Sequence, residues 1–245
     1  MKKILLLSFA ILCAGGGFAQ QRPASTNNTL TERERSEGWI LLFDGESFGQ
    51  WRQYNGDKMP EQWSIENESM KIATGVRVGS GAGADIIYAG RQFSNFELSI
   101  DWMTERRGNS GIFYYVVEEA GRPIYYSAPE VQILDNTYAS DNALTNHLAG
   151  SLYDMLPALP INGREHGQWN NIVIKVDNGH VTHTQNGVKV CEYTLWTPEW
   201  YAMVARSKFR DWPGFNSGPA KTGYIGLQDH GFAVWFRNIK IRELR

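Results

Sequence analysis

The stretch from 170 to 193 constrains the fold more than any other part of the chain. Ile172, Ile174 and Val176 alternate with polar or charged neighbours or with a second β-branched residue, which is the period of a strand. Asn-Gly pairs follow at 178–179 and at 186–187. Both residues tolerate the positive φ that a two-residue hairpin turn needs, so each pair predicts a hairpin. We therefore expect three consecutive antiparallel strands here.

Further strands are predicted along the rest of the chain. Residues 96–102 alternate apolar and polar side chains. In the last predicted strand, 233–242, Val234 and Phe236 share one face while Ile239 falls on the other phase, so we expect a bulge at 237–238. The other expected strands lie at 39–43, 62–66, 70–73, 85–88, 111–117, 129–134 and 224–228. Many short strands with little helical periodicity predict an all-β fold, a jelly-roll sandwich of two antiparallel sheets.

The first 19 residues read as a signal peptide. Lys2 and Lys3 precede an apolar run at 4–12, and Gly-Phe-Ala at 17–19 fits a cleavage site. The run is too short to span a bilayer as a helix, and no later segment is apolar enough to be a membrane anchor. Leu12, rather than a small residue, precedes Cys13, which disfavours a lipid anchor. We expect export to the periplasm or secretion, a flexible polar lead-in at 20–37 and one domain at 38–245.

Composition excludes some classes of function and favours another. The formal net charge is −2 and no basic face is evident, which argues against a nucleic-acid partner. The sequence lacks a His-x-Glu-x-x-His motif, a Cys-x-x-Cys pair and an Asp-rich calcium loop, so it offers no strong metal motif. It contains 9 Trp and 11 Tyr residues. Sugar rings stack on aromatic side chains, so this content suits a carbohydrate ligand.

The segment Glu-Val-Gln-Ile-Leu-Asp at 130–135 is the sharpest local signal. On a strand, Glu130 and Gln132 point to one side and Val131 to the other. A bulge before Asp135 would turn its carboxylate to the Glu130 side. The spacing is similar to the catalytic strand of laminarinase-type glucanases, which carry an acid where Gln132 stands. Two carboxylates on one face could divide acid and base roles; the alternative is a polar strand face that ends in a turn.

Asp229 and His230 follow a predicted strand end. A His beside an Asp can be a base with its orienting partner, a pair of metal ligands or part of a turn. Adjacent strand residues point opposite ways, so the two side chains need not converge.

Two long segments, 135–169 and 196–221, show no clear periodicity but keep many aromatic residues. Ordered loops of this length are usually functional. We expect these segments to wall an active face around Glu130 and the Asp229-His230 pair.

Seven ordered motifs resemble one bacterial family, the 3-keto-disaccharide hydrolases, also described as 3-keto-glucoside lyase/hydratases. The match covers about 39–244. The motifs are Leu-Phe-Asp-Gly at 42–45 with Trp51, Gly-Asn-Ser-Gly-Ile-Phe at 108–113, the 130–135 segment, Ala-Gly-Ser-Leu-Tyr-Asp at 149–154, Gly-Gln-Trp-Asn at 167–170, Ser-Lys-Phe at 207–209, and Gln-Asp-His-Gly at 228–231 with Arg-Asn-Ile at 237–239. The resemblance implies a concanavalin A-like jelly roll, which agrees with the strand pattern.

The resemblance also implies a chemistry. A ketone at C3 of a glucosyl unit acidifies the C2 proton; a base removes it, the C1 substituent leaves, and water adds to the enone. The base is expected to be Glu130 or Asp135, with the other as acid or water activator. Lys208 and His230 are candidates for enolate stabilisation or proton transfer.

The remaining predicted site residues would bind substrate. They are Asn109, Gln132, Asp154, Gln228 and Asp229. No cofactor is firmly implied, although Glu130, Asp135 and His230 could hold a divalent cation. The expected partner is a small oxidised glycoside, whose ketone a separate sugar 3-oxidoreductase must supply. Two other functions stay open: an ordinary retaining glycosidase and a non-catalytic carbohydrate-binding module.

Overall fold

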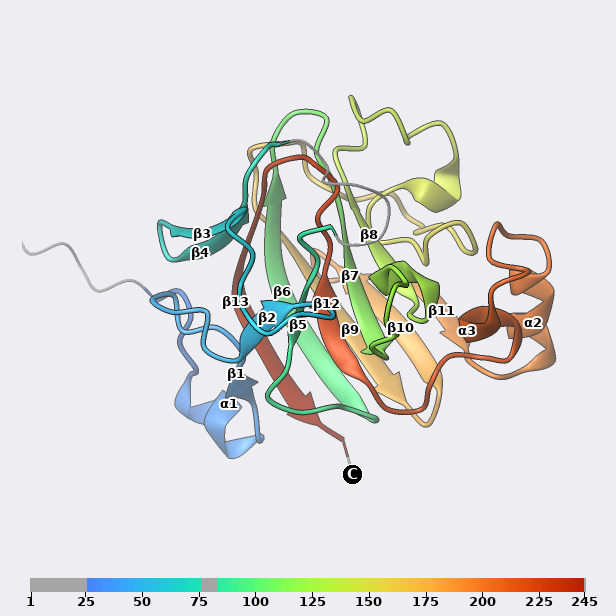
Figure 1. The fold of residues 1–245 in the computed structure, drawn as a ribbon, viewed down its shortest axis with the longest axis horizontal. Helices are drawn as coiled ribbons and strands as arrows, with labels where there is room; N and C mark the ends of the chain where they lie inside the picture. The colour runs from blue at the N-terminus through green and yellow to red at the C-terminus, as the bar shows by residue number, and fades with distance from the viewer. Residues whose placement is uncertain (1–25, 76–82, 245) are drawn as a thin grey trace, which may run out of the picture.

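Two antiparallel sheets packed face to face form the protein, as Figure 1 shows. The computed structural model describes residues 26–75 and 83–244. Sheet A has the order β11-β10-β9-β6-β13-β4-β3, with β1 also paired to β13. Sheet B has the order β2-β5-β12-β7-β8. The predicted all-β jelly-roll sandwich is confirmed.

The strand bounds follow the predicted pattern closely. Sheet A contains β1 (Ile40–Leu41), β3 (Trp63–Glu66), β4 (Ser69–Ile72), β6 (Phe96–Thr104), β9 (Asn170–Asp177), β10 (His180–Gln185), β11 (Val188–Thr194) and β13 (Val234–Glu243). Sheet B contains β2 (Trp51–Gln53), β5 (Ile86–Tyr88), β7 (Asn109–Val116), β8 (Glu130–Leu134) and β12 (Tyr224–Leu227). The short strand β2 was not predicted.

Local turn chemistry explains the meander and the bulge. Asn178 and Asn186 have φ of 50°, and the glycines after them are also at positive φ, as a two-residue hairpin requires. The pairing of β13 with β6 shifts between Arg237 and Lys240, which confirms the predicted bulge. Asn238 takes a φ of 51° there.

The main core lies between the sheets. Alternate residues of each strand enter it, such as Leu98 and Ile100 on β6 and Ile112 and Tyr114 on β7. A smaller apolar cluster, which includes Phe113, covers part of the opposite face of sheet B. The outer face of sheet B is therefore only partly covered by apolar side chains. The uncovered part of this face can hold a functional site.

Residues 26–37 differ from the predicted flexible lead-in. They form a short helix, α1 (Glu32–Ser36), whose capping box joins Thr31 and Glu34. Asn28 donates to and accepts from Asn238 on β13, and Glu34 pairs with Lys240. Polar composition alone suggested a flexible segment, but these polar groups have specific partners on sheet A. The predicted signal peptide lies outside the described residues.

The two predicted irregular segments hold short helices. η2 (Thr145–His147) lies in the first, and α2 (Pro198–Val204) and α3 (Pro213–Asn216) lie in the second; η1 (Ile124–Tyr126) precedes β8. Figure 1 shows the yellow-green segment 135–169 and the orange segment with α2 and α3 on the β8 side of the sandwich. In the part of the chain described, no helix is long and apolar enough to cross a bilayer.

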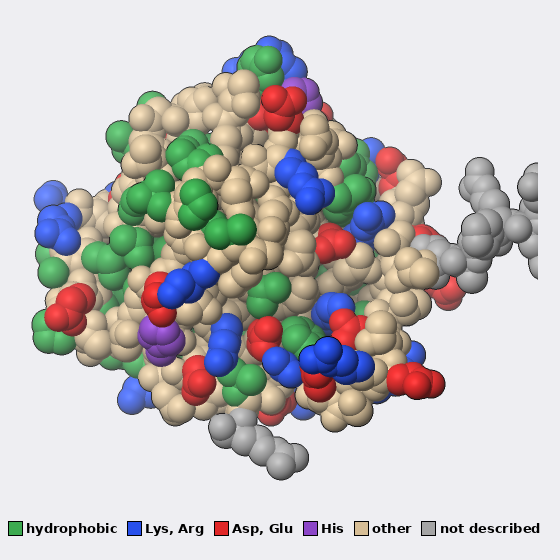
Figure 2. Space-filling model, turned by 180° about the vertical axis from the view of Figure 1, so that it is seen from behind, with side chains coloured by type: hydrophobic (Ala, Val, Ile, Leu, Met, Phe, Trp, Pro, Cys, Tyr) green, Lys and Arg blue, Asp and Glu red, His purple; other side chains and the backbone are tan. Residues whose placement is uncertain are grey.

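Charges of both signs are interspersed on the face behind the view of Figure 1, as Figure 2 shows. Ion pairs join neighbouring elements of sheet A, for example Arg242 with Glu97 at 2.6 Å and Lys71 with Glu66 at 2.7 Å. Ion pairs at the surface, such as the exposed pair of Lys71 with Glu66, contribute little to stability.

Candidate active site

A pocket of about 300 Å³ lies on the outer face of sheet B, at the ends of β7, β8 and β12. The alternation of side chains along β7 and β8 determines which residues form the floor of this pocket. The β7–β8 register pairs Gly111 with Gln132 and Phe113 with Glu130, so Glu130 and Gln132 point away from the main core together. The prediction that these two side chains share one face is confirmed.

Glu130 is the buried carboxyl group of the pocket, with 7% of the residue exposed. A Cβ atom at position 111 would lie 2.3 Å from Glu130 Oε1, so the carboxyl fits only because Gly111 has no side chain. With its amide oriented to satisfy both polar atoms, Gln132 donates to Glu130 Oε1 over 3.2 Å and to the Ser110 carbonyl over 3.1 Å.

The surroundings of Glu130 favour its protonated form. Burial raises its pKa to about 8, Lys208 opposes that rise, and the negative charges of Asp85 and Asp141 add to it. A carboxyl group with a pKa near the working pH can both take up and release a proton during a reaction.

Lys208 and His230 line the same pocket as Glu130, as predicted. Lys208 Nζ lies 4.0 Å from the centre of the Tyr153 ring and 5.2 Å from that of Phe209. The pocket therefore brings a cation and an imidazole to the wall around a buried carboxyl, a set of groups that can transfer protons and stabilise an oxyanion.

Three amide side chains also line the pocket: Asn109, Gln132 and Gln228. Gln228 is 5% exposed, and its Oε1 has no hydrogen-bond partner among the described residues. A buried polar atom without a partner is costly, so Gln228 Oε1 is available to accept from a ligand hydroxyl.

Asp135 does not join Glu130. The β7–β8 register runs without a shift, so no bulge turns the chain. The Asp135 carboxylate instead accepts from the backbone N–H of Arg107 at 2.8 Å and of Thr137 at 3.1 Å. His166 Nδ1 lies 3.6 Å from it. The expectation of a paired Glu130 and Asp135 is therefore wrong, because one backbone amide of the β6–β7 turn and one of the segment after β8 hold the Asp135 carboxylate, and Asp135 does not line the pocket.

Asp229 and Asp154 support the site from outside the pocket lining. Asp229 accepts from the backbone N–H of Ala84 at 3.1 Å and of Gly231 at 2.9 Å, which fixes the turn that carries His230. Asp154 accepts from the backbone N–H of Lys208 at 2.7 Å. Neither carboxylate is among the residues that line the pocket.

The structure does not assemble the predicted cation ligands. Asp135 is held by backbone amides and does not line the pocket that contains Glu130 and His230. Among the residues that the structure describes, no group of three or more His, Cys, Asp or Glu side chains is arranged to hold a metal ion.

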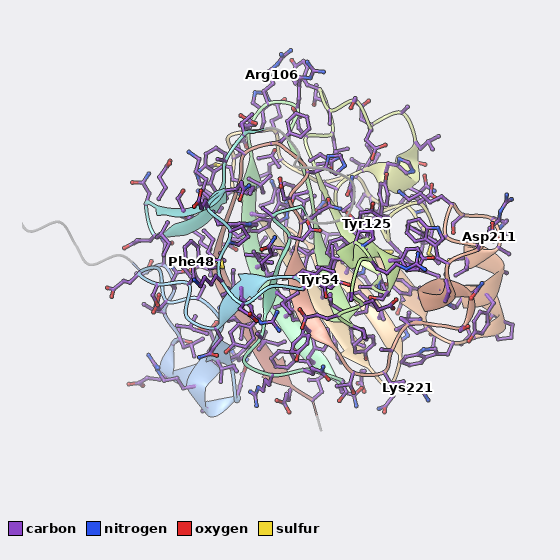
Figure 3. All side chains as sticks on the ribbon, viewed as in Figure 1. Phe48, Tyr54, Arg106, Tyr125, Asp211 and Lys221 are labelled. Atoms are coloured by element: carbon purple, nitrogen blue, oxygen red, sulfur yellow. The ribbon has the colours of Figure 1, made fainter. Side chains whose placement is uncertain are left out.

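The predicted irregular segments do wall the pocket. Segment 135–169 contributes Asp141 and Tyr153, and segment 196–221 contributes Lys208, Phe209 and Trp212. Tyr125 of η1 completes an aromatic side; its ring centre lies 5.7 Å from that of Trp212. Figure 3 shows Tyr125 at the front of the sandwich, with Asp211 beyond it at the edge formed by α2 and α3.

Sequence reasoning missed Asp141, Tyr125 and His147 as functional candidates. His147 lies behind the wall, with its Nδ1 2.8 Å from Asp141 Oδ1 and its Nε2 2.8 Å from Asp154 Oδ1. The persistence of aromatic residues in irregular sequence was the available signal for the walls. No local pattern identified Asp141, because its neighbours in the pocket come from distant parts of the chain.

Comparisons with known proteins agree with the fold and identify the family. Residues 38–242 match the family described as the 3-keto-alpha-glucoside-1,2-lyase-like domain. A curated 3-keto-disaccharide hydrolase of Bacteroides thetaiotaomicron is 42% identical, over 93% of this chain and 86% of that protein.

Two solved structures are also similar to this chain. A candidate glycosyl hydrolase from Parabacteroides distasonis is 29% identical with a TM-score of 0.80, over 89% of this chain and 100% of that one. A Bacillus subtilis protein with a galectin-like fold is 14% identical with a TM-score of 0.50, over 80% of this chain and 90% of that one. The second likeness is one of fold alone.

Proposed function

Because the chain belongs to the 3-keto-alpha-glucoside-1,2-lyase-like family, we propose that it cleaves 3-keto-glycosides by elimination and hydration. The relative from Bacteroides thetaiotaomicron is named for the hydrolysis of 3-keto-disaccharides. The observation that carries the proposal is Glu130, a buried carboxyl with a raised pKa on the floor of a pocket that also contains Lys208 and His230.

Glu130 is the base in this proposal. The C3 ketone acidifies the C2 proton of the sugar, and the Glu130 carboxylate removes it to give an enolate. Collapse of the enolate expels the C1 substituent, which takes up a proton as it leaves. Water then adds across the C1–C2 double bond of the enone, so the net change is hydrolysis. A carboxylate with a raised pKa is a stronger base than an ordinary one, which suits a carbon acid.

The other pocket residues have complementary roles. Lys208 supplies positive charge, and Lys208 and His230 supply hydrogen bonds, to the enolate oxygen and to the leaving oxygen. Asn109, Gln132 and Gln228 orient the sugar hydroxyls. The aromatic side formed by Tyr125, Phe209 and Trp212 receives the leaving group, since sugar and phenyl rings both stack on aromatic faces.

The proposal also includes a cellular setting. The signal peptide predicted at 1–19 would deliver the enzyme to the periplasm or the outside. A separate sugar 3-oxidoreductase must form the ketone before this enzyme acts.

Matched substrates test the proposal. We would offer 4-nitrophenyl glucoside and its 3-keto derivative, each with hydrogen or deuterium at C2, and record nitrophenol release and the enone. Release from the keto substrate alone, with slower release from its deuterated form, is the expected result. Release from both substrates would indicate an ordinary glycosidase, and binding without release would indicate a carbohydrate-binding module; either result would overturn the proposal.

A variant and a pH profile test the role of Glu130. Glu130→Gln is expected to lower kcat about 100-fold or more, because the amide cannot accept the proton. Glu66→Gln, in an ion pair with Lys71 away from the pocket, is the matched control and should keep full activity. kcat/KM should rise with pH and level off near the pKa of about 8, since only the ionised carboxyl is a base. A profile that is flat below that pH and falls above it would instead make Glu130 an acid.

A further inference from the structure

We infer that His147 is a positioning residue, which fixes the Asp141 carboxylate in the pocket wall and, through Asp154, the main chain of Lys208. The inference rests on the proposed function for its kinetic test. His147 itself is outside the pocket lining, and its side chain is 12% exposed.

The hydrogen bonds around His147 form one continuous chain. Tyr153 donates its hydroxyl to Asp141 Oδ2 at 2.8 Å, and Asp141 Oδ1 lies 2.8 Å from His147 Nδ1. His147 Nε2 lies 2.8 Å from Asp154 Oδ1, and Asp154 Oδ2 accepts from the backbone N–H of Lys208 at 2.7 Å. This chain ties segment 135–169 to the loop that carries Lys208.

The geometry requires two protons between His147 and its carboxylates. Each short N···O contact needs a proton, and a neutral imidazole supplies only one. Whichever atoms carry these protons, the ring orients two carboxyl groups at once, and both oxygens of Asp141 are engaged.

Both ends of this series of hydrogen bonds lie at Lys208. The Tyr153 ring lies under Lys208 Nζ at 4.0 Å, and the His147 ring packs on Tyr153 with 4.5 Å between ring centres. Asp154 holds the Lys208 backbone and takes a φ of 59°, a left-handed conformation that Asp tolerates better than most residues. The position of the pocket cation is thus set by contacts that pass through His147.

His147 also contacts Asp141, whose negative charge acts on Glu130. Asp141 is one of the groups that raise the pKa of Glu130, together with burial and Asp85, while Lys208 lowers it. The groups that face His147 are Asp141 and Asp154, with the Tyr153 ring against it. Removing the imidazole leaves the Asp141 charge without a proton from its partner, which should raise the pKa of Glu130 further.

The kinetic test compares His147→Gln with His180→Gln on the 3-keto substrate. His180 is the matched control, because it also contacts a carboxylate, Glu192 at 3.0 Å, but lies on β10 away from the pocket. We expect His147→Gln to lower kcat about tenfold or more with a smaller change in KM, and to move the rising limb of the kcat/KM profile to higher pH. Unchanged kcat, or a fall in kcat and thermal stability without movement of the limb, would overturn the inference.

Magnetic resonance separates this inference from the proposed function. If the wild-type protein does not turn over the keto substrate, the proposed function fails. The inference is then decided by the carbon-13 titration of the Glu130 carboxyl, which should move to higher pH in His147→Gln; an unmoved titration would contradict it. If His147→Gln does not fold, nitrogen-15 spectra of the His147 ring in the wild-type protein test the inference. Protons on or shared by both His147 ring nitrogens support the inference, and a ring nitrogen that neither carries a proton nor accepts a hydrogen bond opposes it.

Discussion

Glu130 and Asp135 lie five positions apart in the sequence and meet opposite surroundings. Glu130 faces the pocket over Gly111, and burial raises its pKa to about 8. Asp135 accepts hydrogen bonds from two backbone N–H groups, those of Arg107 and Thr137. The same chemical group is therefore buried with a raised pKa at one position, where we propose that it transfers a proton, and accepts backbone hydrogen bonds at the other.

Substitution of Asp135 should reduce stability rather than chemistry. Asp135→Ala leaves two backbone N–H groups without their acceptor, so we expect the free energy of unfolding to fall by about 1–3 kcal/mol. Asp135→Asn keeps one acceptor and should cost less. Urea denaturation measures both, and turnover of the folded fraction on the keto substrate should stay near wild type. A well-folded Asp135→Asn protein without activity would show that Asp135 belongs to the site after all.

At the scale of elements, the β7–β8 pair both supports the sheet and forms the pocket floor. Ile112 on β7 and Val131 on β8 enter the main core, while Gly111 and Glu130 lie on the opposite face. The alternation of side chains across a strand thus separates packing from chemistry within one hairpin. Segments 135–169 and 196–221 then supply the walls.

Two Gly→Ala variants separate an effect on activity at the pocket from an effect on stability elsewhere in the fold. At Gly111 the new Cβ would meet the Glu130 carboxyl at 2.3 Å, so Gly111→Ala should displace that carboxyl and lower kcat about tenfold or more. At Gly223 the Cβ would meet the Tyr115 backbone at 2.3 Å, which cannot move easily. Gly223→Ala should therefore lose more unfolding free energy, measured in urea. Full activity of Gly111→Ala would show that the close approach of Gly111 to Glu130 does not position the carboxyl.

At the scale of the whole molecule, burial of Glu130 links the stability of the fold to pH. The folded protein holds this proton more tightly than the unfolded chain does, since its pKa is raised from 4.5 to about 8. The stabilisation is fully present below the unfolded pKa and is lost as the pH rises toward 8. His183 acts in the opposite sense, because burial lowers its pKa to about 4, so its contribution is lost as the pH falls through the range between the two values of 6.5 and about 4.

Comparison with Glu130→Gln isolates this linkage, because the amide stays neutral and His183 is common to both proteins. The variant should be close to wild type in unfolding free energy near pH 5 and more stable than wild type near pH 8.5. The difference should reach a few kcal/mol, with about 5 kcal/mol as the upper bound. Urea denaturation at the two pH values gives the result, and an equal difference at both would show that Glu130 is not a buried titrating group.

The sequence by itself determined the all-β fold, the three-stranded meander, the bulge at 237–238 and the shared face of Glu130 and Gln132. These features depend on alternation and turn chemistry, which act between near neighbours in the chain. The family resemblance predicted that Lys208 and Gln228 join Glu130, whereas only the tertiary structure decided that Asp135 turns away and that Asp141 lines the same pocket. Positions 130, 141, 208 and 228 are separated in the sequence, and the packing of loops on the outer face of sheet B brings them together. No periodicity within a short stretch of sequence predicts that packing.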